Sequence, residues 1–262
     1  MKKVLFVFTT LLFFACNDAG DTASESTVKY RDVDSDNLKG DISMIELSPY
    51  AIDSTMTMGD MDSCCTSVTE YNADGNTVKN YTKDSKGTKK SETMYTRHPN
   101  GLPENINSTG ENGKSTGSFH IKLDEDGKII LAQAIDSNGN ADVYYTDITT
   151  NEVGEVTGWK QYDKDSVYRQ MGASVYDGHK FISFTLTDSV GTVKNTGSSK
   201  YNDMGEEIES TNINVGKDTT VTKYTYPEHD EQGNWTKRIT YNKDGKPTKV
   251  HIRTITYRTK PE

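Results

Sequence analysis

The sequence predicts an all-β protein, built as a long antiparallel up-and-down meander of about 14–16 strands. The meander either closes into a soluble barrel or stays a rolled single-layer sheet. Three observations predict it. After residue 15 the chain holds only six Leu against 32 Thr, a balance that disfavours helices and suits pleated strands. Glycine corners recur at near-regular spacing, and apolar residues alternate with polar ones between them.

Composition also limits the function. Only 32% of the 262 residues are hydrophobic, 26% are charged, and the formal net charge is −9. An acidic, polar chain argues against an integral membrane protein and against a nucleic-acid binder, which needs a basic face. No sequence pattern for a cofactor is present.

The amino end has the features of an export signal. Lys2 and Lys3 precede a short apolar run that closes in Phe14-Ala15-Cys16. The run is too short to span a bilayer, and a small residue before Cys resembles the lipobox of bacterial lipoproteins. Residues 1–15 are therefore predicted to be a signal peptide, with Cys16 lipidated. The alternative is an ordinary secretory signal cleaved elsewhere. Residues 16–37, acidic and without periodicity, are predicted to be a flexible tether.

Residues 38–262 form the predicted β-repeat domain. Successive turn glycines from Gly75 to Gly154 are separated by 12, 14, 12, 14, 12 and 15 residues. Glycine adopts a positive φ without a Cβ clash, so each corner is expected to join two strands of about eight residues. A glycine-free turn at Asp163-Lys164-Asp165 fills the longest gap. The unit is about 26 residues, or two strands.

Alternation favours a single layer over a sandwich. Phe119, Ile121 and Leu123 share one face of their segment, whereas both faces of residues 192–200 are polar. A two-layer sandwich would need more inward-facing aliphatic residues than the chain offers. Strands that spanned a membrane would need an outward apolar band, which these segments lack.

Several segments resemble the YD (Rhs-like) repeat of bacterial lipoproteins. Residues 71–76 and 201–205 match Tyr-Asp/Asn-x-x-Gly, residues 37–40 read Asn-Leu-Lys-Gly, and residues 230–238 with 253–257 resemble the carboxyl end of such proteins. The resemblance covers about residues 37–262. It implies an all-β repeat protein without assigned catalysis, so no catalytic residue is carried over. Some related domains are described as porin-like, so the resemblance also implies that a closed soluble barrel would be porin-like.

Two candidate sites follow from residue chemistry. Thioethers and thiolates are soft ligands that favour Cu(I), so the Met/Cys cluster is a candidate copper site; it comprises Met56, Met58, Met61, Cys64 and Cys65. The alternative is that these cysteines are a vicinal disulfide or free. Aromatic rings on a polar sheet are candidate stacking platforms for sugars: Trp159, Trp235, Tyr144, Tyr145, Tyr224 and Tyr226. The competing interpretation is that these rings make cross-strand pairs that hold the sheet together.

Histidines lie without ligand spacing, and no nucleophile, phosphate or zinc motif occurs, so we expect a protein that is not an enzyme. The sequence predicts a lipid-anchored protein of the Gram-negative cell envelope, at the outer membrane. Its domain would be a binding or structural module that contacts a glycan or an envelope protein. The alternative is a periplasmic carrier of a small molecule or copper. A closed barrel with a polar lumen would favour the carrier, and an open sheet would favour surface contact.

Overall fold

The computed structural model describes residues 30–62, 65–217 and 219–259. These residues form one short helix and a single antiparallel sheet of seventeen strands. The elements are α1 (Asp32–Ser35), β1 (Ile42–Ile52), β2 (Met58–Met61), β3 (Thr66–Tyr71), β4 (Thr77–Lys83), β5 (Lys89–Arg97), β6 (Pro103–Gly110), β7 (Ser115–Leu123), β8 (Ile129–Ile135), β9 (Ala141–Thr150), β10 (Val156–Asp163), β11 (Tyr168–Asp177), β12 (Lys180–Asp188), β13 (Val193–Tyr201), β14 (Glu207–Asn214), β15 (Thr219–His229), β16 (Trp235–Tyr241) and β17 (Pro247–Tyr257).

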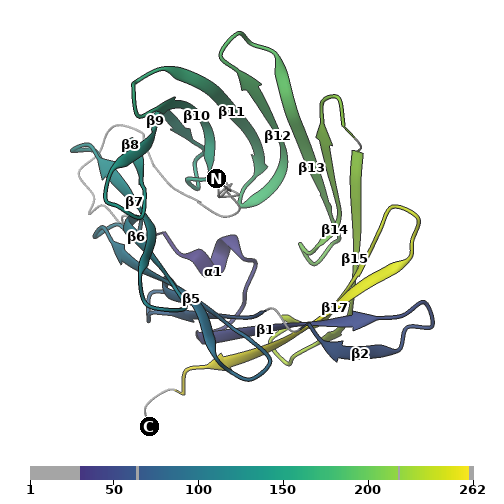
Figure 1. The fold of residues 1–262 in the computed structure, drawn as a ribbon. Coiled ribbons are helices and arrows are strands. Elements are labelled where there is room, and N and C mark those ends of the chain that lie inside the picture. Colours follow the sequence, from purple (N-terminus) through teal and green to yellow (C-terminus); the bar gives the residue numbers. More distant parts are fainter. Residues whose placement is uncertain (1–29, 63–64, 218, 260–262) are drawn as a thin grey trace, which may run out of the picture.

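The sheet closes on itself. Each strand from β3 to β17 pairs with the next along the chain, and β1 pairs on one side with β17 and on the other with β3. The result is a closed ring of sixteen strands, while the short β2 pairs with β1 beside it. Figure 1 shows the ring, with α1 inside it. The predicted meander is confirmed, and of the two arrangements left open the barrel is the one observed.

A repeated turn joins the strands. At residues 136–140, the Asp136 N–H donates to the Asn140 carbonyl (2.8 Å) and the Gly139 N–H to the Asp136 carbonyl (3.0 Å). The Asp136 carboxylate accepts two more backbone N–H groups, and Gly139 has φ +85°. Asn or Asp therefore satisfies the turn's donors, and glycine supplies the positive φ. The glycine-free turn predicted at residues 163–165 is confirmed, with Ser166 at φ +61°.

The two ends of the barrel differ. Successive turns lie at alternate ends, and at one end the residue after the turn glycine is mostly buried: Asn76, Leu102, Glu155, Glu206 and Asn234. Here Lys128 is the exposed exception. At the other end the equivalent residues are exposed: Thr88, Lys114, Asn140, Thr192, Lys217 and Lys246. We call the first end the plug end and the second the far end.

Residues 30–40, which we call the plug, lie inside the barrel at the plug end (Figure 1). Tyr30, Val33 and Leu38 are each at most 8% exposed and pack in two clusters against the wall, which contain most of the buried apolar side chains. The predicted tether therefore needs correction at its carboxyl end. Residues 30–37 are held inside the barrel, because these three side chains give the segment enough apolar area to bury. Cys16 and the rest of residues 1–29 lie outside the described residues.

Strand register assigns the inner and outer faces of the wall. Thr69 lines a cavity beside the plug, and it lies opposite Asn80, which lies opposite Thr93 on the next strand. Directly opposite residues share a face, so this series follows the interior. Glu70 and Lys79 have the other parity and form an ion pair outside (3.3 Å). Among the described residues, no helix is long and apolar enough to cross a membrane.

Candidate ligand site in the barrel lumen

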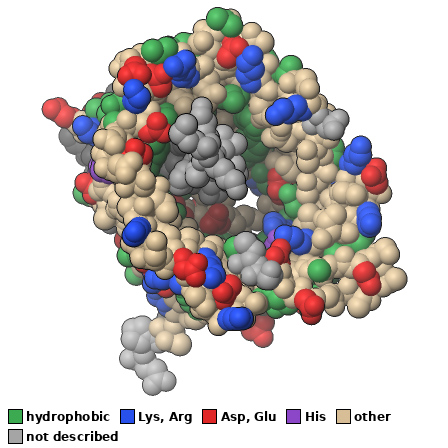
Figure 2. Space-filling model, viewed as in Figure 1, with side chains coloured by type: hydrophobic (Ala, Val, Ile, Leu, Met, Phe, Trp, Pro, Cys, Tyr) green, Lys and Arg blue, Asp and Glu red, His purple; other side chains and the backbone are tan. Residues whose placement is uncertain are grey.

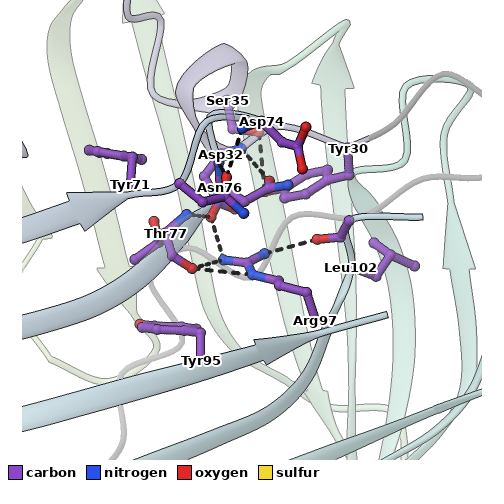
Figure 3. Close-up of polar contacts among 12 residues, drawn as sticks. Tyr30, Asp32, Ser35, Tyr71, Asp74, Asn76, Thr77, Tyr95, Arg97 and Leu102 are labelled. Atoms are coloured by element: carbon purple, nitrogen blue, oxygen red, sulfur yellow. Dashed lines mark hydrogen bonds and ion pairs between the residues drawn. The ribbon is translucent and has the colours of Figure 1, made fainter. Parts of the chain in front are cut away.

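The plug is fixed to the wall by an ion pair and backbone contacts (Figure 3). The Asp32 carboxylate accepts hydrogen bonds from the Arg97 guanidinium (2.5 Å) and from the Thr77 N–H (2.6 Å). Arg97 also donates to the Thr77 and Gly101 carbonyls, and the Asp32 N–H donates to the Asn76 side chain (3.2 Å). Charged partners strengthen these bonds, so the amino-terminal half of the plug is pinned to β4, β5 and their turns.

The carboxyl-terminal half of the plug is held by the β15–β16 turn. The Asn234 amide accepts from the Lys39 N–H and donates to the Lys39 carbonyl, both at 2.8 Å. It also donates to the Tyr257 hydroxyl (2.7 Å), and a Cβ on Gly40 would lie 2.9 Å from the Tyr257 ring. The segments that resemble the YD-repeat lipoproteins at residues 37–40, 230–238 and 253–257 thus meet at the plug end.

Two carboxyl groups with raised pKa values lie at the plug, Glu155 buried in the wall beneath it and Asp36 on the plug itself. The Glu155 side chain is 0% exposed and its Oε1 accepts from Ser35 (3.1 Å) and faces His179 Nδ1 (2.7 Å). Burial raises the pKa of Glu155 to about 7. Asp36 accepts from the Tyr71 hydroxyl (3.2 Å), and burial, together with the charge of Asp32, raises the pKa of Asp36 to about 6. Both groups bind a proton more readily than in water, because the surrounding protein disfavours their charged forms.

A cavity of about 170 Å³ lies between the plug and the wall. Its lining comprises Asp36, Leu38, Ile45, Leu47, Ser67, Thr69, Tyr71 and Arg253. Figure 2 shows the wider hollow of the barrel around its axis, surrounded by a wall that carries both signs of charge. The plug therefore narrows the lumen at this end, and Arg253 lines the cavity between the plug and the wall.

A cluster of cations and aromatic rings extends from Arg253 along β15–β17; we call it the lumen cluster and define it as Tyr224, Tyr226, Trp235, Arg238, His251 and Arg253. The Arg253 guanidinium lies 3.4 Å from the centre of the Trp235 ring. The Arg238 guanidinium lies 5.1 Å from the centres of both the Trp235 and Tyr224 rings. These are cation–π distances, and Tyr226 packs on Trp235 at 5.7 Å between ring centres.

The lumen cluster contains buried polar atoms without a hydrogen-bond partner: Arg238 Nε, His251 Nδ1 and Arg253 Nε, with Thr240 Oγ1 beside them. Burial lowers the pKa of Arg253 to about 10. Burial, aided by the charges of Arg238 and Lys249, lowers the pKa of His251 to about 4, so this imidazole is neutral at pH 7. Buried polar atoms without partners cost free energy, so the lumen cluster carries an unsatisfied hydrogen-bonding capacity.

The six predicted stacking residues lie in three different parts of the barrel. Trp235, Tyr224 and Tyr226 belong to the lumen cluster. Tyr145 and Trp159 face the lumen from β9 and β10, in an edge-to-face pair with ring centres 5.4 Å apart. Tyr144 has the opposite parity from Tyr145 and lies on the outer wall. The lumen rings pack on side chains of neighbouring strands, as the competing interpretation expects, and their role as stacking platforms for sugars stays a prediction.

Toward the far end the interior is polar. Hydroxyl and amide side chains pair across the strands, as in Thr82–Ser91 (2.7 Å), Thr93–Ser108 (3.0 Å) and Asn195–Asn212 (2.9 Å). These groups are neutral and hydrogen-bond readily to water or to a hydroxylated ligand. The lumen is therefore polar at the far end and cationic and aromatic near the plug.

The predicted copper ligands lie around the β1–β2 hairpin. Met56 and Met58 are 46% and 49% exposed, and the Met61 sulfur accepts from the Thr66 hydroxyl (3.6 Å). Cys65 is disulfide-bonded, so its sulfur is not a thiolate in this state; Cys64 lies outside the described residues. Within residues 30–62, 65–217 and 219–259, no cluster of three His, Cys, Asp or Glu is arranged to hold a metal. The copper site stays a prediction.

Sequence reasoning missed Arg238, His251 and Arg253. No short motif contains them, because they come from two strands and share a face only through the cross-strand register of Arg238 with His251. A weak signal exists. His251 and Arg253 are two residues apart in a strand, which places both on one face.

No protein-family model matches the chain, and no curated protein matches it. A solved porin-like protein from Bacteroides uniformis ATCC 8492 is 14% identical, covering 82% of this chain and 96% of its own, with a TM-score of 0.54. One from Bacteroides vulgatus ATCC 8482 is 14% identical over 84% and 99%, with a TM-score of 0.34. The TcdB2-TccC3-TEV structure is 16% identical over 78% and 11%, with a TM-score of 0.32. The chain shares the porin-like barrel fold of the first of these.

Proposed function

We propose that this protein is a ligand-binding barrel of the bacterial cell envelope, which takes a small polar ligand into its lumen. One observation carries the proposal: a closed barrel with a plug at one end, whose inner wall changes from neutral hydrogen-bonding side chains to a cluster of aromatic and cationic groups near the plug. Sixteen strands enclose a lumen wider than side chains alone can fill. Aromatic rings with a few convergent polar groups are typical of ligand sites.

The lumen is a better site than the outer wall. The outer face has ion pairs between neighbouring strands, such as Lys79 with Glu70 and Glu92 (3.3 and 3.7 Å), and these pairs satisfy its charges locally. The lumen cluster, in contrast, has buried donors that are unsatisfied. The proposal therefore favours a carrier or receptor over a purely structural module. Sugars are the first candidates, because pyranose rings stack on Trp and Tyr while their hydroxyls bond to amides.

The proposal includes the amino end. Cys16 would be the lipid attachment site, and residues 16–29 would connect it to the plug, so that the barrel is held at the outer membrane of a Gram-negative cell. Two or three acyl chains would anchor the protein firmly. The YD-like repeat is part of the same proposal: each turn-and-two-strand unit would add a section of wall.

Tryptophan fluorescence can detect a ligand in the lumen, because the chain has two tryptophans, Trp159 and Trp235, and both face the lumen. The experiment is a fluorescence titration of the purified full chain in detergent with mono- and oligosaccharides. We expect saturable changes in tryptophan emission, lost in Tyr224→Ala and retained in Tyr144→Ala, which removes the same side chain from the outer wall. Binding that Tyr144→Ala abolishes and Tyr224→Ala leaves intact would contradict the proposal.

A further inference from the structure

Two of the arginines, Arg238 and Arg253, differ from the others in their ion pairing. The protein has six arginines. Four of them are in ion pairs with a carboxylate: Arg31 with Asp34, Arg97 with Asp32, Arg169 with Asp163 and Arg258 with Asp41. Arg238 and Arg253 make none within 4.0 Å among the described residues, although they are the pair in the lumen. Unpaired guanidinium groups are rarely buried, because desolvation is costly unless an anion compensates it.

The two guanidinium groups share the Trp235 ring, and no carboxylate of the described residues lies within 4.0 Å of either. Arg238 is directly opposite His251 across β16 and β17, and Arg253 follows two residues later on the same face. The positive charge of Arg238 contributes to lowering the pKa of both His251 and Arg253, as expected for a repulsion between like charges. The Asp36 carboxylate on the plug opposes this effect on Arg253, and it also accepts from the Tyr71 hydroxyl (3.2 Å).

Aromatic contacts fix the orientation of these cations. The face of the Arg253 guanidinium is against Trp235, and Arg238 is between Trp235 and Tyr224. Stacking occupies the face of a guanidinium and leaves its N–H edge for a planar, two-oxygen acceptor. The Nε atoms of both arginines are without a partner. The arrangement is therefore preorganised for an oxyanion.

We propose that Arg238 and Arg253 bind the oxyanion of an acidic sugar, with Trp235 and Tyr224 beside the sugar ring. This inference rests on the proposed function and specifies its ligand class. The neutral amides and hydroxyls farther along the lumen would accept and donate to the sugar hydroxyls. The anion would remove the repulsion between the cations, so that the charge of the ligand, and not only its shape, provides the affinity.

The test is calorimetric titration of the full chain with glucuronate, glucose 6-phosphate, glucose 6-sulfate, glucose and inorganic sulfate. The two sources of an oxyanion, carboxylate and phosphate or sulfate ester, are thus separate arms. We expect at least one acidic sugar to bind at least tenfold more tightly than glucose, with affinity falling as salt rises. Arg238→Gln and Arg253→Gln should each lose about tenfold or more. Arg169→Gln, an exposed arginine paired with Asp163, should leave the affinity unchanged.

Circular dichroism and thermal unfolding of each variant show whether it folds. If one arginine variant does not fold, the other variant and the salt dependence of binding to the unmodified chain still test the acidic-sugar inference. Equal affinity for glucose and the acidic sugars, or wild-type affinity in both arginine variants, would overturn the acidic-sugar inference and leave the lumen carrier standing. Failure of every sugar to bind would overturn both. If sulfate binds as tightly as the acidic sugars, the acidic-sugar inference is also overturned, since the sugar ring would then add no affinity.

Discussion

The plug end can be tested with a matched pair of glycine substitutions. Gly101 (φ +89°) is in a plug-end turn, and Gly113 (φ +71°) is in a far-end turn of the same kind. A Cβ at Gly101 would lie 2.6 Å from the carbonyl oxygen of Tyr30, whereas a Cβ at Gly113 would meet nothing within 4 Å. Gly101→Ala and Gly113→Ala therefore share the backbone cost but differ in contact with the plug.

The magnitude follows from these contacts. Placing Ala at a left-handed φ costs about 1–2 kcal/mol in either variant. Gly101→Ala adds an overpacking cost of about 1–3 kcal/mol, because its new neighbour is backbone and cannot rotate away. If the plug end moves to relieve the clash, the chain gives up the burial of Tyr30, which is worth about 1.5–3 kcal/mol. Both routes predict that Gly101→Ala is less stable than Gly113→Ala by about 1–3 kcal/mol.

The assay is urea unfolding of both variants, with amide hydrogen exchange resolved over residues 30–40. We expect faster exchange of the plug in Gly101→Ala, and unchanged exchange there in Gly113→Ala. Equal unfolding free energies, with equal protection of residues 30–40 in both variants, would refute the reasoning that the plug packs on this turn.

Three further predictions concern buried groups. Tyr30→Ala should lower the unfolding free energy by about 3–5 kcal/mol, measured by urea denaturation; a loss below 1 kcal/mol would contradict the burial of this ring. Because the folded pKa of Glu155, about 7, is above its ordinary 4.5, its contribution to stability is full below pH 4.5 and lost as pH rises toward 7. The unfolding free energy, measured from pH 5 to 8, should therefore fall more steeply in the unmodified chain than in Glu155→Gln. Parallel curves for the two proteins would contradict the raised pKa of Glu155. Gly197→Ala should destabilise by about 1–3 kcal/mol, since its Cβ would overlap the Phe184 ring; a thermal melt unchanged from the parent chain would reject this contact.

The repeated turn explains why so much of the fold could be predicted. The side chain of Asp136 or its equivalents satisfies donors within four residues, and Gly139 supplies the backbone angle. Both effects are local, so they can be inferred from short sequence windows. The candidate site was less accessible. Three of six predicted aromatic residues belong to the lumen cluster, but Tyr144 is on the outer wall, because a neighbouring position reverses the face.

Residues 30–37 show a feature of the fold that short sequence windows do not predict. Residues 30–37 are polar and without periodicity, and by themselves they favour a tether. Their few apolar side chains, such as Val33, are buried only because the barrel surrounds them on several sides. Arg238 and Arg253 show the same limit. Each is one polar residue in an ordinary strand, and the register between two strands brings them together.

The sequence by itself determined the strands, the turns between them and their antiparallel order, because turn chemistry and alternation act over a few residues. Only the tertiary structure decided that β1 meets β17, which end is plugged and which side chains converge in the lumen. These outcomes depend on twist and register accumulated around sixteen strands. A short sequence window does not contain this information, because the twist and register add up over the whole barrel.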